Sequence, residues 1–180
     1  MLNKKRIDMA ESNVKNYMQE GLLKEVRVKE EQVKKILLGD CKESLKVAEI
    51  LFNNNYSSLW TIVCSYYSMY YISRAVLYEL GYNTGENRTH KVVSDALIVH
   101  VRNKLKESLL EDYEELREEA LEISGNKADE LLENFDFERV KRSRFQYSTT
   151  EIVMRAKANT SLERAKRFVF EMEKLMDGVT

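Results

Sequence analysis

Apolar residues recur along most of the chain at intervals of three and four positions, which is the spacing of one face of an α-helix. No strand-like alternation of any length is present. The pattern therefore predicts an all-α fold, a helical bundle with an extra N-terminal helix. The predicted helices cover residues 4–20, 29–52, 57–80, 91–105, 107–123 and 127–142, and a last helix runs through Leu162 to Met176.

Polar and glycine-containing stretches predict where these helices end. Gly21 ends the first helix, and Asn53-Asn54-Asn55 ends the second, because both residue types tolerate the left-handed conformation of a helix stop. Ser124-Gly125-Asn126 predicts a further break.

The start of the last helix is predicted from two features. The periodicity fades from Ser143 to Asn159, which predicts a loop or a frayed short helix. Thr160 and Glu163 then have the spacing of a capping box, in which each side chain bonds a backbone N–H of the first turn.

The segment 57–80 is apolar on nearly all sides, which is typical of a helix at the centre of a bundle. Residues 53–73 carry no charge, and that length could span a bilayer. Three asparagines open the segment and several serines interrupt it, so we predict a buried helix and no membrane partner.

The composition supports a helical protein that needs no disulfide or metal site to stabilise its fold. The chain has 180 residues, no proline and six glycines, which disfavours sandwiches, barrels and other turn-rich folds. We expect a helical extension at residues 1–28 and a bundle at residues 29–180. Cys41 and Cys64 have no metal or disulfide spacing and indicate two buried thiols in a reducing cytoplasm, so no metal or cofactor is expected.

Charge is segregated into two neighbouring blocks. Residues 107–136 hold twelve acids and two bases, whereas residues 139–167 hold nine bases and two acids. The blocks can face each other within the fold or across a dimer, or be solvated. Alternatively, the basic block binds an anion or RNA, and Phe145 and Tyr147 within it could stack on bases.

Two further groups of residues have open interpretations. Tyr66, Tyr67, Tyr70 and Tyr71 fit a core or a dimer interface as well as a stacking site. Arg74 lies in an otherwise apolar helix. A charge buried there costs free energy unless it pairs with an opposite charge or contacts water. Arg74 could pair with Glu79 or line a pocket with His90. His90 itself could cap or pack, or contact phosphate, whereas His100 between two valines indicates packing.

Part of the chain resembles the HEPN domain, a helical domain of higher eukaryotes and prokaryotes associated with nucleotides. The similarity covers about residues 33–176 and is greatest to an uncharacterised, largely archaeal branch. It is carried by Ser65-Tyr66-Tyr67-Ser68-Met69-Tyr70, by Thr89-His90 after a glycine-containing loop, and by Arg144-x-x-Tyr147 within RVKRSRFQY. The family's own element is Arg-x-x-x-Tyr, so the spacing of the third landmark departs from it.

The resemblance implies an up-and-down helical bundle that commonly forms a homodimer. Some HEPN proteins are metal-independent ribonucleases that use an arginine and a histidine separated by four to six residues. Others bind nucleotide or RNA without catalysis, often beside a separate nucleotidyltransferase or in toxin–antitoxin systems. Before His90 the motif positions are occupied by Gly85, Thr84 and Asn83, and before His100 by Asp95, Ser94 and Val93, so the ribonuclease signature is absent.

The sequence therefore favours a cytoplasmic, non-catalytic module that binds nucleotide or RNA. A divergent ribonuclease using His90 with an arginine from another segment, and a protein-interaction partner, remain as alternatives. The predicted binding residues are Arg142, Arg144, Tyr147, His90 and Arg74, and His90 is the one weak catalytic candidate.

Overall fold

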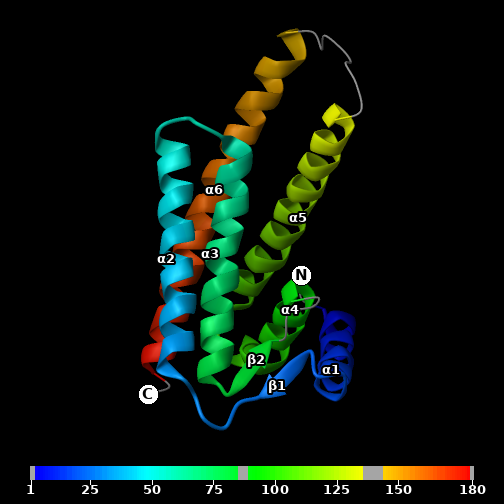
Figure 1. Ribbon diagram of the computed structural model, residues 1–180, viewed down its shortest axis with the longest axis vertical. Helices are drawn as coiled ribbons and strands as arrows, with labels where there is room; N and C mark the ends of the chain where they lie inside the picture. Colours follow the sequence, from blue (N-terminus) through cyan, green and yellow to red (C-terminus); the bar gives the residue numbers. More distant parts are fainter. Residues whose placement is uncertain (1–2, 85–88, 136–143, 179–180) are drawn as a thin grey trace.

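The computed structural model describes residues 3–84, 89–135 and 144–178, with the side chains of 126–153 outside the description. It confirms the all-α fold class (Figure 1). None of the helices in these ranges is long and apolar enough to cross a membrane. The helices are α1 (Lys4–Gln19), α2 (Glu31–Asn53), α3 (Ser58–Glu79), α4 (Thr89–His100), α5 (Glu107–Phe135) and α6 (Arg144–Asp177).

Helix α3 lies at the centre of the bundle, as its uniform hydrophobicity predicts. It packs against α2, α4, α5 and α6 (Figure 1). The Ser57 hydroxyl accepts a hydrogen bond from the backbone N–H of Trp60 and so caps its first turn. Two buried serines on α3 donate their hydroxyls to the helix backbone, Ser68 to the Ser65 carbonyl and Ser73 to the Met69 carbonyl. These short side chains allow neighbouring helices to approach closely.

The predicted stops after α1 and α2 are confirmed by backbone geometry. Gly21 has φ +71° and Asn55 has φ +55°, both in the left-handed region. A side chain at residue 21 would be strained by the backbone alone, which explains the glycine there.

A short two-stranded sheet is present although no strand was predicted. Strand β1 (Leu23–Glu25) pairs antiparallel with β2 (Tyr82–Thr84), so that Leu23 lies opposite Thr84. Strands of three residues are too short for a period of two to be visible in the sequence. This sheet fastens the N-terminal segment to the loop that precedes α4.

The predicted break at residues 124–126 is wrong. Helix α5 runs without interruption through Gly125, whose missing side chain faces open space. The Ser124 hydroxyl donates back to the Ala120 carbonyl at 2.8 Å, a bond compatible with a continuous helix. One glycine inside a helix costs only about 1 kcal/mol, which the rest of a 29-residue helix outweighs.

The predicted loop or frayed short helix at 143–159 and the capping box at Thr160 are also wrong, because α6 is one continuous helix from Arg144 to Asp177. The Thr160 hydroxyl donates to the Ala156 carbonyl one turn earlier, and Glu163 pairs with Lys166 instead of reaching back. The same sequence pattern, a serine or threonine followed by glutamate three residues later, also occurs inside helices. There the glutamate can form an i,i+3 pair with another side chain of the helix. A third boundary differs as well: α4 ends at His100, and a 3₁₀ turn, η1 (Arg102–Lys104), follows.

The acidic and basic blocks meet within one chain through three of the bases whose side chains are described, Lys157, Arg164 and Arg167. Asp112 accepts from Arg164 at 2.9 Å and also from Arg167. Lys157 pairs with Glu119 at 3.3 Å. We call these contacts the α5–α6 seam. Of the interpretations that the sequence leaves open for the charge blocks, the described part of the basic block fits neutralisation within the fold.

Asp112 is the centre of that seam and supports a stability prediction. Its side chain is 11% exposed and holds two arginines, so Asp112→Asn should lower the free energy of unfolding by about 2 kcal/mol. Glu115→Gln removes a carboxylate that is 64% exposed and should cost less than about 1 kcal/mol. Urea unfolding of both variants tests this, and equal stabilities would contradict the central role of Asp112.

Candidate functional site

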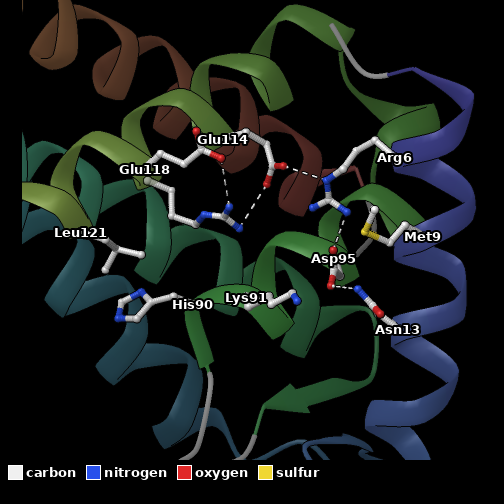
Figure 2. Close-up of a pocket in the computed structure, with 10 residues that line it drawn as sticks. Arg6, Met9, Asn13, His90, Lys91, Asp95, Glu114, Glu118 and Leu121 are labelled. Atoms are coloured by element: carbon white, nitrogen blue, oxygen red, sulfur yellow. Dashed lines mark hydrogen bonds and ion pairs between the residues drawn. The ribbon is translucent and has the colours of Figure 1, made fainter.

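A buried carboxylate on α4 organises the contact between α1 and the bundle. The Asp95 side chain is fully buried, which is costly for a charge unless it is paired and hydrogen-bonded. It accepts hydrogen bonds from Arg6 at 2.6 Å, from Asn13 at 2.9 Å and from Tyr17 at 2.9 Å. All three donors are on α1, so this carboxylate fixes the position of that helix (Figure 2).

The Arg6 guanidinium joins three helices. Besides Asp95, it donates to the Glu114 carboxylate on α5 at 3.0 Å and to the Ser94 hydroxyl on α4 at 3.0 Å. Burial alone would raise the pKa of Glu114. Hydrogen bonds from Arg6 and Ser94, and the positive charges nearby, outweigh burial and leave that pKa below its ordinary value. Glu114 is therefore ionised at neutral pH.

A cavity of about 720 Å³ lies beside this network, between α1, α4 and α5. In Figure 2, His90 and Leu121 lie at one end of the cavity, and Met9 and Asn13 at the other. Cations contribute to the lining through Lys91 and Arg117. We call this space the His90 cavity.

Tyrosines of α3 hold the His90 ring in place. The Tyr66 hydroxyl lies 2.7 Å from His90 Nδ1, and the His90 ring packs against the Tyr70 ring at 4.5 Å between centroids. Burial raises the pKa of Tyr66, so its hydroxyl keeps its proton and can donate it to Nδ1. In that arrangement the neutral imidazole carries its own proton on Nε2, where it can serve as a donor.

Two arginine charges act on His90. Burial, followed by the charges of Arg117 and Arg74, lowers the pKa of His90 below its ordinary value. The imidazole is therefore neutral at neutral pH. An anion bound near these cations would offset their charge and favour the protonated ring.

Arg74 does not form the predicted pair with Glu79. Glu79 is held instead by Lys29 and Lys34, each at 2.9 Å. Arg74 lies 5.7 Å from the Tyr70 ring centre, and its buried Nε has no hydrogen-bond partner among the described residues. Its charge acts on His90, but Arg74 is not among the residues that line the His90 cavity, so the alternative that the two residues line one pocket stays a prediction.

Arg117 and Lys91 are the cations of the cavity that retain free hydrogen-bond donors among the described residues. Arg117 is 14% exposed, and its ion pairs with described residues are long, 3.4 Å to Glu114 and 3.7 Å to Glu118. Lys91 is exposed, and within the described part of the chain no ion pair is formed by it. By contrast, the Arg6 guanidinium already donates hydrogen bonds to both Asp95 and Glu114.

The other predicted residues have varied outcomes. Arg142 lies outside the described residues, and Arg144 and Tyr147 are on α6 with side chains outside the description. His100 packs as predicted, stacked on Tyr82 at 4.0 Å between ring centres. Cys41 is buried and Cys64 half-buried, both as free thiols. Burial, with smaller effects of nearby charges, raises the pKa of Cys41 to about 12, so that thiol is unsuited to nucleophilic chemistry.

Sequence reasoning missed the Arg6–Asp95–Glu114 network and the cavity that it borders. One signal could have revealed it: Asp95 is a lone acid in the apolar run 92–98, where a buried charge requires a cation from another element. Among the residues whose side chains are described, His, Cys, Asp and Glu do not gather in groups of three that could hold a metal.

Comparisons with family models, with curated proteins and with solved structures give no match for this chain.

Proposed function

We propose that the protein is a HEPN-type module that binds a nucleotide or RNA without cleaving it, with a phosphate group in the His90 cavity. One observation carries this proposal. A neutral histidine, held by a tyrosine hydroxyl, lies within reach of two arginine charges at one end of a cavity lined by further cations.

The charges of the cavity support a bound anion. Arg117 retains hydrogen-bonding capacity because both of its ion pairs are long, and Lys91 can reach solvent. A guanidinium suits a phosphate because its donors form a planar fork that matches two phosphate oxygens. The Nε2 proton of His90 would add a third donor.

The shape of the cavity supports a ligand with an apolar part. Its volume of about 720 Å³ is within the range of small-molecule sites. The exposed side chains Met9 and Leu121 line it and provide apolar surface for a base.

The test is an RNA-binding titration of wild type and Lys91→Gln at two salt concentrations, with a short labelled oligouridylate. Wild-type affinity should fall steeply with salt, because phosphate binding releases counterions. Lys91→Gln should weaken binding about fivefold and reduce the salt slope by about one.

Lys104→Gln is the matched control, because Lys104 is an exposed lysine of η1 that does not line the cavity. It should bind as wild type does. Absence of RNA and nucleotide binding, or equal losses in both lysine variants, would contradict the proposed site.

The divergent ribonuclease is a second candidate, favoured by one observation. The charges of Arg74 and Arg117, from two other segments, act on His90, and a metal-free ribonuclease needs an imidazole beside phosphate-binding cations. Incubation of RNA with the protein in EDTA tests it, with His90→Ala as the comparison. Cleavage equal in both proteins, or absent from both, would reject this candidate.

We also propose that the protein forms a homodimer. Helix α2 exposes Ile36 and Val47, three turns apart, at 52% and 37% of their surface. Light scattering after size exclusion measures the mass directly. A mass near 21.2 kDa at micromolar concentration would contradict the dimer.

A further inference from the structure

The turn between α2 and α3 lies next to α6 (Figure 1). Two large aromatic side chains at this end of the bundle are exposed, Tyr56 in the turn at 71% and Trp60 in the first turn of α3 at 51%. Exposed apolar surface of this kind can mark a binding site. The question is what covers them.

The turn is rigid, so the aromatic side chains are presented in a fixed place. Asn55 is left-handed, its N–H donates to the Phe52 carbonyl at 3.1 Å, and the Tyr56 N–H donates to the Leu51 carbonyl at 2.9 Å. These two bonds form a Schellman motif, in which the residue at the position of Tyr56 commonly packs back on the helix. Here the Tyr56 ring is instead left in solvent.

A cation of α6 is anchored at the same turn. The Arg155 guanidinium lies 4.6 Å from the centre of the Phe52 ring, donates to the Phe52 carbonyl and also bonds the Asn55 side chain. These partners are all uncharged, so they fix the guanidinium without neutralising it.

Arg155 differs in this respect from the other bases of the basic block whose side chains are described. Lys157, Arg164, Lys166 and Arg167 each pair with a carboxylate, including Glu49 at 3.3 Å from Lys166. For Arg155, no carboxylate within ion-pair distance is found among the described residues. Within the described part of the chain, the charge of Arg155 is therefore unpaired at the turn that carries the two exposed aromatic residues.

We propose that Tyr56, Trp60 and Arg155 form a platform for single-stranded RNA, on which bases stack while Arg155 contacts the backbone phosphate. Aromatic rings beside an arginine are the combination that single strands use, because every base has a stacking face. This inference rests on the proposed function in taking nucleic acid as the ligand, but it assigns a second surface outside the His90 cavity. Arg144 and Tyr147 precede Arg155 on α6 by roughly 16 and 12 Å, so the basic block continues from the platform along the same helix.

Trp60 is the one tryptophan of the chain, and its fluorescence therefore reports on the platform alone. A short oligouridylate should quench Trp60 emission, whereas ADP, which fits the His90 cavity, should leave it unchanged. Tyr56→Ala and Arg155→Gln should each weaken oligonucleotide binding about fivefold or more and leave ADP affinity at the wild-type value.

Two control variants match these changes. Phe170→Ala removes an exposed aromatic ring outside the platform, on α6. Lys157→Gln removes a base that lies near Arg155 on α6 but is already paired with Glu119. Both should bind the oligonucleotide as wild type does. Circular dichroism of every variant shows whether the helices are retained.

The outcomes separate this inference from the proposed function. Labelled oligouridylate that binds without quenching Trp60, and with wild-type affinity for the Tyr56 and Arg155 variants, would overturn the platform alone. Quenching by the oligonucleotide without any ADP binding would support the platform and contradict the His90 cavity. Trp60 emission that changes with protein concentration in the absence of RNA would show that a second copy covers the turn, and would also overturn the platform.

Discussion

Arg6→Met should lower the free energy of unfolding by about 3 kcal/mol or more at neutral pH, the largest loss expected from any single surface-accessible residue. The substitution keeps an unbranched side chain but removes the cation that faces Asp95 and Glu114. Asp95 would then be a fully buried carboxylate whose remaining described donors are the neutral side chains of Asn13 and Tyr17. Urea unfolding at neutral pH measures the loss.

Arg102→Met is the matched control for this change. Arg102 also connects to α1, through Glu11 at 3.3 Å, but Glu11 is 48% exposed. An exposed ion pair contributes little, so this variant should lose no more than about 1 kcal/mol. Equal losses in the two variants would contradict the special role of the Asp95 network.

The same variant should show a weaker dependence on pH. The folded-state pKa of Glu114 lies below its ordinary value of 4.5, so its contribution to stability is present above that pH. The contribution is lost as the pH falls through the folded-state pKa. Wild type should therefore lose more stability than Arg6→Met as the pH falls below 4.5, and the stabilities of the two proteins should approach each other there.

Arg117→Met should weaken ADP binding about ten- to a hundredfold, the largest effect expected on the proposed activity. Arg117 is mostly buried at the cavity and makes only long ion pairs, so its donors are available to a phosphate. Isothermal titration calorimetry measures the change in affinity, and urea unfolding of the same variant separates binding from folding.

Two neighbouring substitutions sharpen this test. Arg117→Lys keeps the charge but not the planar fork, so its affinity should lie between those of wild type and Arg117→Met. Glu118→Gln removes an exposed acid that competes for Arg117 and should leave ADP affinity equal or higher. Wild-type affinity in Arg117→Met would place the ligand elsewhere.

The sequence predicts well the features that depend on the backbone preference of single residues or on the hydrophobicity of one segment. Gly21 and Asn55 adopt the left-handed backbone that only a few residue types tolerate, and the uniformly apolar segment 57–80 becomes the central helix. For Arg74 the sequence offers two alternatives, a pair with Glu79 or a place with His90 in one pocket. The first is wrong because Lys29 and Lys34, which are distant in the sequence, pair with Glu79 instead.

The features that the sequence does not predict depend on competition between local signals and packing. Ser124-Gly125-Asn126 favours a break by propensity, but a long helix overrides one glycine. Charge segregation in the linear sequence allows either blocks that face each other or an exposed basic surface, and only the structure shows that most of the described bases pair across the α5–α6 seam. The Arg6–Asp95 pair joins residues 89 positions apart, a separation that no local pattern encodes.

Proton NMR of the two histidines would test the central claim, that a phosphate binds beside His90, most directly. The chain has only His90 and His100, so both imidazole resonances can be followed through a pH titration, and His100 serves as an internal reference far from the bound anion. In the free protein, His90 should titrate below its ordinary pKa of 6.5 because of burial and the charges of Arg117 and Arg74. Saturating ADP should raise that pKa and leave His100 unchanged, and ADP affinity should increase as the pH falls through the same range. A His90 titration curve that ADP at saturating concentration does not move would contradict the account.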